Sequence, residues 1–172
     1  SRASGLQDKQ QHPALYDEMF VAMAANLQHT QDTNKQTLEQ AVSLMDQAAH
    51  VYICGFRASF PVAWSLHYIY RLFHRHVSLI DGLANNQEMY TREITAQDVV
   101  VVTGFAPYSR EIVQIIEYAQ AAGATLIAIT DSAVSPLAQA ARCSLLFPTN
   151  SPSFFPSIVS AMGLSELSLI HI

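Results

Sequence analysis

Apolar positions follow a strand–helix–strand pattern between residues 98 and 131. Val99 to Val102 is an unbroken β-branched run, which is typical of a strand buried on both faces of a sheet. After a short loop, apolar residues recur at the spacing i, i+3, i+4, i+7 of one helix face, at Ile112, Ile115, Ile116 and Ala119. Gly123 stands where a helix C-cap favours positive φ, and Leu126 to Ile129 is a second apolar run. Strand, helix and strand in this order predict a right-handed parallel crossover unit.

The rest of the chain alternates in the same way. Short apolar runs predict three more strands, at Val51–Cys54, Val77–Ile80 and Ser144–Phe147. Helical spacing and helix-start residues predict helices over residues 13–49, 59–74, 85–92 and 135–138 and from residue 157 onward. No Pro or Gly lies between Pro13 and Ala49, so the two helical stripes of this stretch are expected to be nearly continuous.

This alternation predicts an α/β fold. We expect a three-layer α/β/α sandwich with a parallel sheet of about five strands, preceded by N-terminal helices. Residues 1–25 are expected to form a linker and N-terminal helix, and residues 26–172 a single domain. Ligands of open α/β sheets collect at the C-terminal ends of the strands, so the loops at 103–109 and 130–135 should share one edge of the sheet.

Composition narrows the class of protein. Half of the residues are hydrophobic and 13% are charged, which favours a compact fold over disorder. The net charge of −5 gives no basic face for duplex DNA, so this chain alone is not expected to hold DNA. Cys54 and Cys143 sit in or beside apolar runs and are expected to be buried free thiols. With no apolar run of roughly 20 residues and a polar beginning, we expect a cytoplasmic protein without a membrane partner.

Two of the loops that follow strands share one design. Gly55 is followed by Ser59, and Gly104 by Ser109, so each loop puts a glycine and then a hydroxyl where a helix begins. Backbone N–H groups and the helix dipole favour an anion there, and serine adds a donor. An alternative is that the serines only cap their helices and the glycines only form turns. Neither loop matches G-x-G-x-x-G or the Walker A pattern.

The order of motifs resembles the SIS (sugar isomerase) domain, in particular the C-terminal effector-binding domain of RpiR/MurR-type bacterial transcription regulators. The segments that carry the resemblance are Gly55–Ser59, Asp98–Thr103, Ser109–Glu111, Gly123–Thr130 and Ser135–Ala138. The resemblance implies a flavodoxin-like fold that binds a sugar phosphate or sugar acid and transmits this to an N-terminal helix-turn-helix domain. We expect no cofactor and no metal.

The chain departs from the family pattern in both ligand loops. Arg57 replaces the second Gly of G-x-G-x-S, and residues 104–107 replace S-x-S-G, so hydroxyls of the family's phosphate cradle are lost. A guanidinium partly offsets this loss because it binds phosphate or carboxylate in a fork; alternatively, Arg57 is only a surface arginine. We expect a small anionic or polyhydroxy effector in one cleft. The candidate ligand-binding residues are Gly55, Arg57, Ser59, Thr103, Gly104, Tyr108 and Ser109.

The alternative function is a sugar-phosphate isomerase, which needs a base beside the sugar carbonyl. Glu88, His67 and Glu166 are the candidates, but an ordinary solvated carboxylate is the favoured interpretation of Glu88 and a packed or interfacial histidine that of His67. We therefore expect no enzyme activity and no catalytic residue. His74 and His76 lack a neighbouring cysteine or carboxylate cluster, so no metal site is expected. A third hypothesis is a catalytically silent SIS module that serves only in oligomerisation.

Large apolar side chains on two predicted helices indicate a homo-oligomer, either a dimer or a tetramer. The first helix carries Tyr16, Met19, Phe20 and Met23, and the helix from Trp64 to Phe73 is rich in aromatics. Such groups are too many for an exposed face. The alternative is that the N-terminal helix folds back on its own core.

Overall fold

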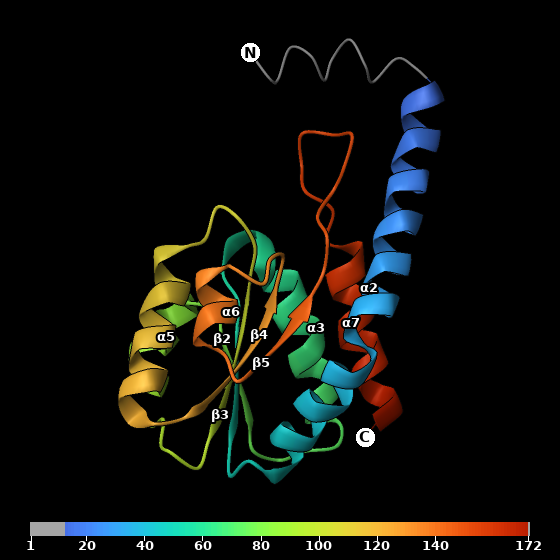
Figure 1. The fold of residues 1–172 in the computed structure, drawn as a ribbon. Helices are drawn as coiled ribbons and strands as arrows, with labels where there is room; N and C mark the ends of the chain where they lie inside the picture. The colour runs from blue at the N-terminus through green and yellow to red at the C-terminus, as the bar shows by residue number, and fades with distance from the viewer. Residues whose placement is uncertain (1–12, 172) are drawn as a thin grey trace.

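The computed structural model describes residues 13–171 and has three layers, with helices on both faces of one sheet (Figure 1). The strands are β1 Val51–Cys54, β2 Val77–Ile80, β3 Val99–Gly104, β4 Thr125–Thr130 and β5 Cys143–Leu146. They are parallel and lie in the order β2-β1-β3-β4-β5. The predicted α/β/α sandwich with a five-stranded parallel sheet is therefore confirmed.

The helices divide between the two faces of the sheet. They are α2 Pro13–Gln47, α3 Phe60–Arg71, α4 Asn86–Thr91, α5 Arg110–Ala122, α6 Pro136–Ala140 and α7 Val159–Leu167, with short 3-10 turns η1 Arg57–Ser59, η2 Leu83–Asn85 and η3 Ser168–His171. Helices α2, α3 and α7 cover one face, and α4, α5 and α6 cover the other (Figure 1). Gly123 ends α5 at φ 73°, as predicted.

Side chains of the central strand alternate between two cores. Val99 and Val101 pack with α2, α3 and α7, whereas Val100 and Val102 pack with α5. All four are at most 4% exposed, which confirms a strand buried on both faces. Cys54 and Cys143 are buried and unbridged, as expected, and burial raises the pKa of both thiols.

Helix α2 is one continuous helix of 35 residues. Its N-terminal half extends beyond the body of the domain (Figure 1), and Asn26 is its first buried residue. The polar stretch between the two predicted helices remains helical because Thr30 and Asn34 face the protein rather than solvent. The expected division at residues 25 and 26 thus falls inside α2, where packing begins, and stays a prediction.

Asn34 closes the exposed edge of the sheet. The Leu146 N–H of β5 donates to Asn34 Oδ1 at 2.7 Å, and Asn34 Nδ2 donates to the Leu146 carbonyl at 2.6 Å. The carboxamide therefore makes the pair of hydrogen bonds that a neighbouring strand would make. Asn34 is 3% exposed, so this contact also fixes the position of α2 against β5.

We expect Asn34→Ala to lower the free energy of unfolding by about 2–3 kcal/mol, because it leaves the two Leu146 backbone groups without partners. Denaturant unfolding followed by circular dichroism measures this loss. Gln36→Ala, at an exposed position of the same helix, is the control and should change stability by less than about 0.5 kcal/mol. Equal stability of the two variants would show that water satisfies the Leu146 N–H and C=O groups without loss of stability.

The two aromatic helix faces are exposed in the single chain. Tyr16 and Phe20 on α2 are 67% and 57% exposed, and Trp64 and Tyr68 on α3 stack with their ring centroids 5.4 Å apart. Met19 and Met23 are half-buried. Among the described residues, the outer half of α2 therefore does not fold back on the core, and its cover by a second copy stays a prediction. No helix in residues 13–171 has the length and apolarity of a membrane span.

We expect this chain to be at least a dimer at micromolar concentration, because association removes these apolar faces from water. Light scattering coupled to size exclusion measures the mass. Phe20→Ser should shift the equilibrium toward monomer if α2 lies in the interface, and Gln31→Ser on the same helix is the matched control. A monomeric mass for the unmodified chain would contradict the prediction.

Candidate functional site

The loops that follow β1 and β3 border one cavity of about 380 Å³ at the C-terminal edge of the sheet. The cavity is lined by Phe56, Arg57, Ala58, Ser59, Thr103, Gly104, Phe105, Pro107, Tyr108, Ser109, Arg110 and Ile112. Of the seven candidate residues, all but Gly55 line it. The structure thus brings the two loops together at the strand ends, although ligand binding by these residues stays a prediction.

Gly55 lies beneath the cavity and shapes it. A Cβ at this position would lie 2.5 Å from the Ala63 Cβ and 2.5 Å from the Thr103 Oγ1. Real side chains do not approach so closely, so only glycine lets the first turns of α3 pack against the ends of β1 and β3. Thr103 Oγ1 donates to the Cys54 carbonyl at 2.9 Å, which ties the two strand ends together.

The two serines have different local roles. Ser109 caps α5, since its Oγ accepts from the Ile112 N–H at 3.2 Å. The expected cap by Ser59 is wrong: Ser59 already has helical angles because η1 runs directly into α3, and Pro61 removes one N–H that a cap would bind. Within the described residues, the Ser59 hydroxyl makes no hydrogen bond and is available to a ligand.

Tyr108 is fixed by an acidic side chain from the neighbouring strand end. Its hydroxyl donates to Asp131 Oδ1 at 2.7 Å, and the Ala106 N–H donates to Asp131 Oδ2 at 3.2 Å. Burial and the hydrogen bond to Asp131 raise the pKa of Tyr108 to about 12, so the phenol stays neutral. Asp131 was not predicted as a site residue. The signal was its place at the end of β4, beside the end of β3.

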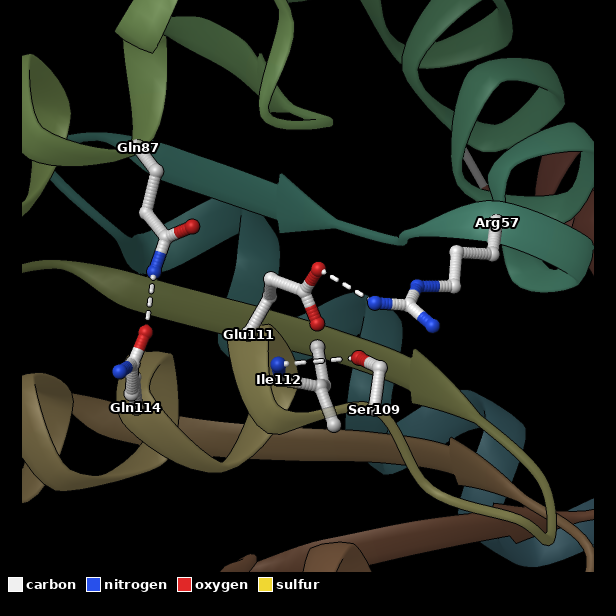
Figure 2. Close-up of polar contacts among 6 residues, drawn as sticks. All are labelled: Arg57, Gln87, Ser109, Glu111, Ile112 and Gln114. Atoms are coloured by element: carbon white, nitrogen blue, oxygen red, sulfur yellow. Dashed lines mark hydrogen bonds and ion pairs between the residues drawn. The ribbon is translucent and has the colours of Figure 1, made fainter.

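Arg57 reaches across the cavity mouth to α5. Its Nη2 lies 3.0 Å from Oε1 of Glu111, the second residue of the helix (Figure 2). The Glu111 backbone amide and the hydrogen bond from Arg57 lower the pKa of the Glu111 carboxyl. The Arg57 backbone has φ 54°, in the left-handed region that glycine adopts freely. Glycine therefore fits the family pattern here for a backbone reason, and arginine holds this conformation under strain.

Arg110 is a second cation of the cavity that sequence reasoning missed. It is the first residue of α5 and lines the cavity beside Ser109. No acidic side chain within the described residues forms an ion pair with it. It occupies a variable position of the family motif, so the sequence offered no signal for it. Its charge stands at the helix end that already favours anions.

The three candidate bases lie outside this cavity. Glu88 pairs with Arg92 and lines a separate groove between α4 and α5, where the side chains of Gln87 and Gln114 are joined by a hydrogen bond of 3.2 Å (Figure 2). Burial and the nearby Arg71 lower the pKa of His67 on α3. Glu166 is exposed on α7. Within residues 13–171, no group of three metal-binding side chains gathers.

Comparisons with known proteins agree with this architecture. A family model for the SIS domain matches residues 44–170. The fold is similar to the sugar isomerase domain of an RpiR transcription factor from Sphaerobacter thermophilus, with a TM-score of 0.86, 24% identity, and 92% of this chain and 89% of that chain covered. It is also similar to the Vibrio vulnificus NanR protein complexed with ManNAc-6P, with a TM-score of 0.78, 17% identity and coverage of 95% and 63%.

A third similar structure is a candidate sugar-phosphate isomerase from Listeria monocytogenes, with a TM-score of 0.75, 14% identity and coverage of 91% and 86%. At these identities the likeness shows a shared fold. A comparison with curated proteins finds no match.

The strain at Arg57 gives a prediction on stability. Arg57→Ala removes the ion pair and keeps a side chain at positive φ, whereas Arg57→Gly removes both the pair and the strain. We expect the glycine variant to be more stable than the alanine variant by about 1 kcal/mol in denaturant unfolding.

Ala58→Gly is the matched control for this pair. Ala58 is exposed, and its φ is not positive, so glycine there should lower stability by about 0.5–1 kcal/mol. An Arg57→Gly variant less stable than Arg57→Ala would mean that residue 57 leaves the left-handed region in solution.

Proposed function

The chain belongs to the SIS domain family, and we propose that it is the ligand-sensing domain of a transcription regulator. Its effector is a small anionic carbohydrate derivative, either a sugar phosphate or a sugar acid. The cavity between the β1 and β3 loops holds this effector, and binding is transmitted to an attached helix-turn-helix domain. The alternative is a sugar-phosphate isomerase of the same fold.

One observation carries the proposal: the chemistry of the cavity wall. Arg57, Arg110 and Ser59 line a space large enough for a sugar phosphate, and the Ser59 hydroxyl has no hydrogen bond within the described residues. Among the described lining residues, none is Asp, Glu or His. Such a wall offers donors to an anion or a polyol, and the carboxylate beside it, Glu111, is paired with Arg57. This supports binding over isomerisation.

The aromatic part of the wall suits the body of a sugar. Phe105, Pro107 and Tyr108 also line the cavity and offer apolar surface to the C–H groups of a sugar ring. Asp131 holds Tyr108 in place before a ligand arrives, so its ring is ordered without further loss of entropy. The ManNAc-6P complex of NanR supports the same ligand class for this fold.

Packing offers a route from the cavity to the N-terminal helix. Helix α3 begins at the cavity with Phe60 and packs against α7, which packs against α2. A ligand that shifts the first turn of α3 can therefore act through α7 on α2, whose N-terminal half extends beyond the body of the domain. We propose that the DNA-binding domain is attached at the N-terminal end of α2. We also propose that ligand binding changes the arrangement of the two chains in a cytoplasmic homodimer. The candidate isomerase from Listeria keeps the alternative open.

We expect ManNAc-6P, or another member of a sugar-phosphate and sugar-acid panel, to raise the stability of the chain in a thermal-shift titration. A ligand at 100 times its Kd should add about 2.7 kcal/mol. Arg57→Ala should weaken binding by about tenfold to a hundredfold, because a charge-assisted hydrogen bond is worth roughly 1.5–3 kcal/mol.

The neutral parent sugars and Arg92→Ala are the controls. Arg92 is an exposed arginine directly after α4 and outside the cavity, so its loss should not change the affinity. Conversion of a bound sugar phosphate, followed by NMR, would establish the isomerase alternative. No shift with any member of the panel would leave the oligomerisation module as the explanation of the fold.

A further inference from the structure

We propose that Glu111 is a specificity-determining residue, whose carboxylate competes with the ligand's anion for Arg57 and so excludes bare anions from the cavity. The inference deepens the proposed function and rests on it, since it concerns the same cavity. An anion that also carries hydroxyl groups, as a sugar phosphate does, escapes this exclusion.

The competing contact is already formed in the ligand-free chain. Glu111 Oε1 lies 3.0 Å from Arg57 Nη2, and the two residues come from different loops, 54 positions apart in the sequence (Figure 2). The pair joins η1 to the first turn of α5, and the cavity residues Arg57, Arg110 and Ile112 lie on these same two elements. Arg57 therefore meets an incoming anion with its charge already neutralised.

The pair is exchangeable because it lies near the surface. The side chains of Arg57 and Glu111 are 74% and 32% exposed. Exposed ion pairs are weak, since water screens the attraction and both long side chains lose freedom in the pair. A ligand that offers Arg57 a phosphate or carboxylate can displace Glu111. The displaced carboxylate stays within reach of the new anion and repels it unless it finds a donor.

The second carboxylate oxygen shows where that donor belongs. Glu111 Oε2 is buried, and the nearby Glu111 backbone amide and Ser109 hydroxyl do not form a well-aligned hydrogen bond with it. A buried carboxylate oxygen without a donor is rare, because its lost hydration is not replaced. A ligand hydroxyl beside the anion would satisfy it. A sugar phosphate supplies both the anion for Arg57 and a hydroxyl for Glu111, whereas sulfate supplies the anion alone.

The cavity keeps a second cation that has no such competitor. Arg110 lines the cavity and forms no ion pair with the described acidic residues. Arg110 therefore attracts any anion to the cavity, whereas Arg57 binds only an anion that can displace Glu111. Arg110 thus selects for charge, and the pair of Arg57 and Glu111 selects for anions that also carry a hydroxyl donor.

The test is a sulfate titration at constant ionic strength, followed by thermal shift, on the full chain. Glu111→Gln keeps the length of the side chain and removes its charge. We expect this variant to respond to sulfate at about threefold to tenfold lower concentration than the unmodified chain. The double variant Arg57→Ala with Glu111→Gln should not show this increased sensitivity to sulfate, because it lacks the guanidinium for which Glu111 competes.

Glu117→Gln is the matched control, because it removes the same charge from an exposed position of the same helix. It should respond like the unmodified chain and so report any general effect of sulfate on stability. Equal sulfate responses of Glu111→Gln and the unmodified chain, or no response in either, would overturn the inference. A gain in the double variant would overturn it as well.

A parallel titration with ManNAc-6P separates this inference from the proposed function. If no variant binds ManNAc-6P or any sugar of the panel while Glu111→Gln still gains for sulfate, the proposed function fails and the role of Glu111 stands. If the unmodified chain binds a sugar phosphate and Glu111→Gln gains nothing for sulfate, the function stands and the role of Glu111 fails.

Discussion

The close approach of backbone at Gly55 is the constraint on which the rest of this site depends. The end of β1, the Thr103 side chain of β3 and the first turns of α3 meet where a methyl group would not fit. Because these elements touch, the loops that follow β1 and β3 open onto one cavity rather than two. The position of Arg57 over that cavity, and its reach to Glu111, follow from the same contact.

The sequence predicted the features that local patterns encode. β-branched runs gave the strands, helical spacing gave α5, and Gly123 marked its end, because each depends on residues close together in the chain. Side-chain pairings across the fold could not be predicted this way. The contact of Asn34 with Leu146 spans 112 positions, and that of Tyr108 with Asp131 spans 23. The wrong cap at Ser59 has the same origin, since η1 absorbs the place where a capping serine would stand.

Replacement of glycine by Arg57 changes how the cavity can hold a ligand. In a glycine-lined loop, fixed backbone N–H groups can surround an anion, whereas this loop carries an exposed side chain on a strained backbone. The arginine also brings a charge that Glu111 balances, and Arg110 adds one that no described acidic side chain balances. In the proposed site, binding would therefore depend on the exchange of side-chain partners more than on a preformed cradle.

The carboxamide of Asn34 has a consequence for how molecules of this protein meet in a crowded solution. An edge strand with free N–H and C=O groups is a template on which a strand of another chain can add, which is how many aggregates and amyloid fibrils begin. At Leu146 both groups are already taken by a side chain that cannot propagate the ladder. One buried amide therefore takes the place of a further strand at Leu146, so a strand of another chain cannot pair with β5 at that residue.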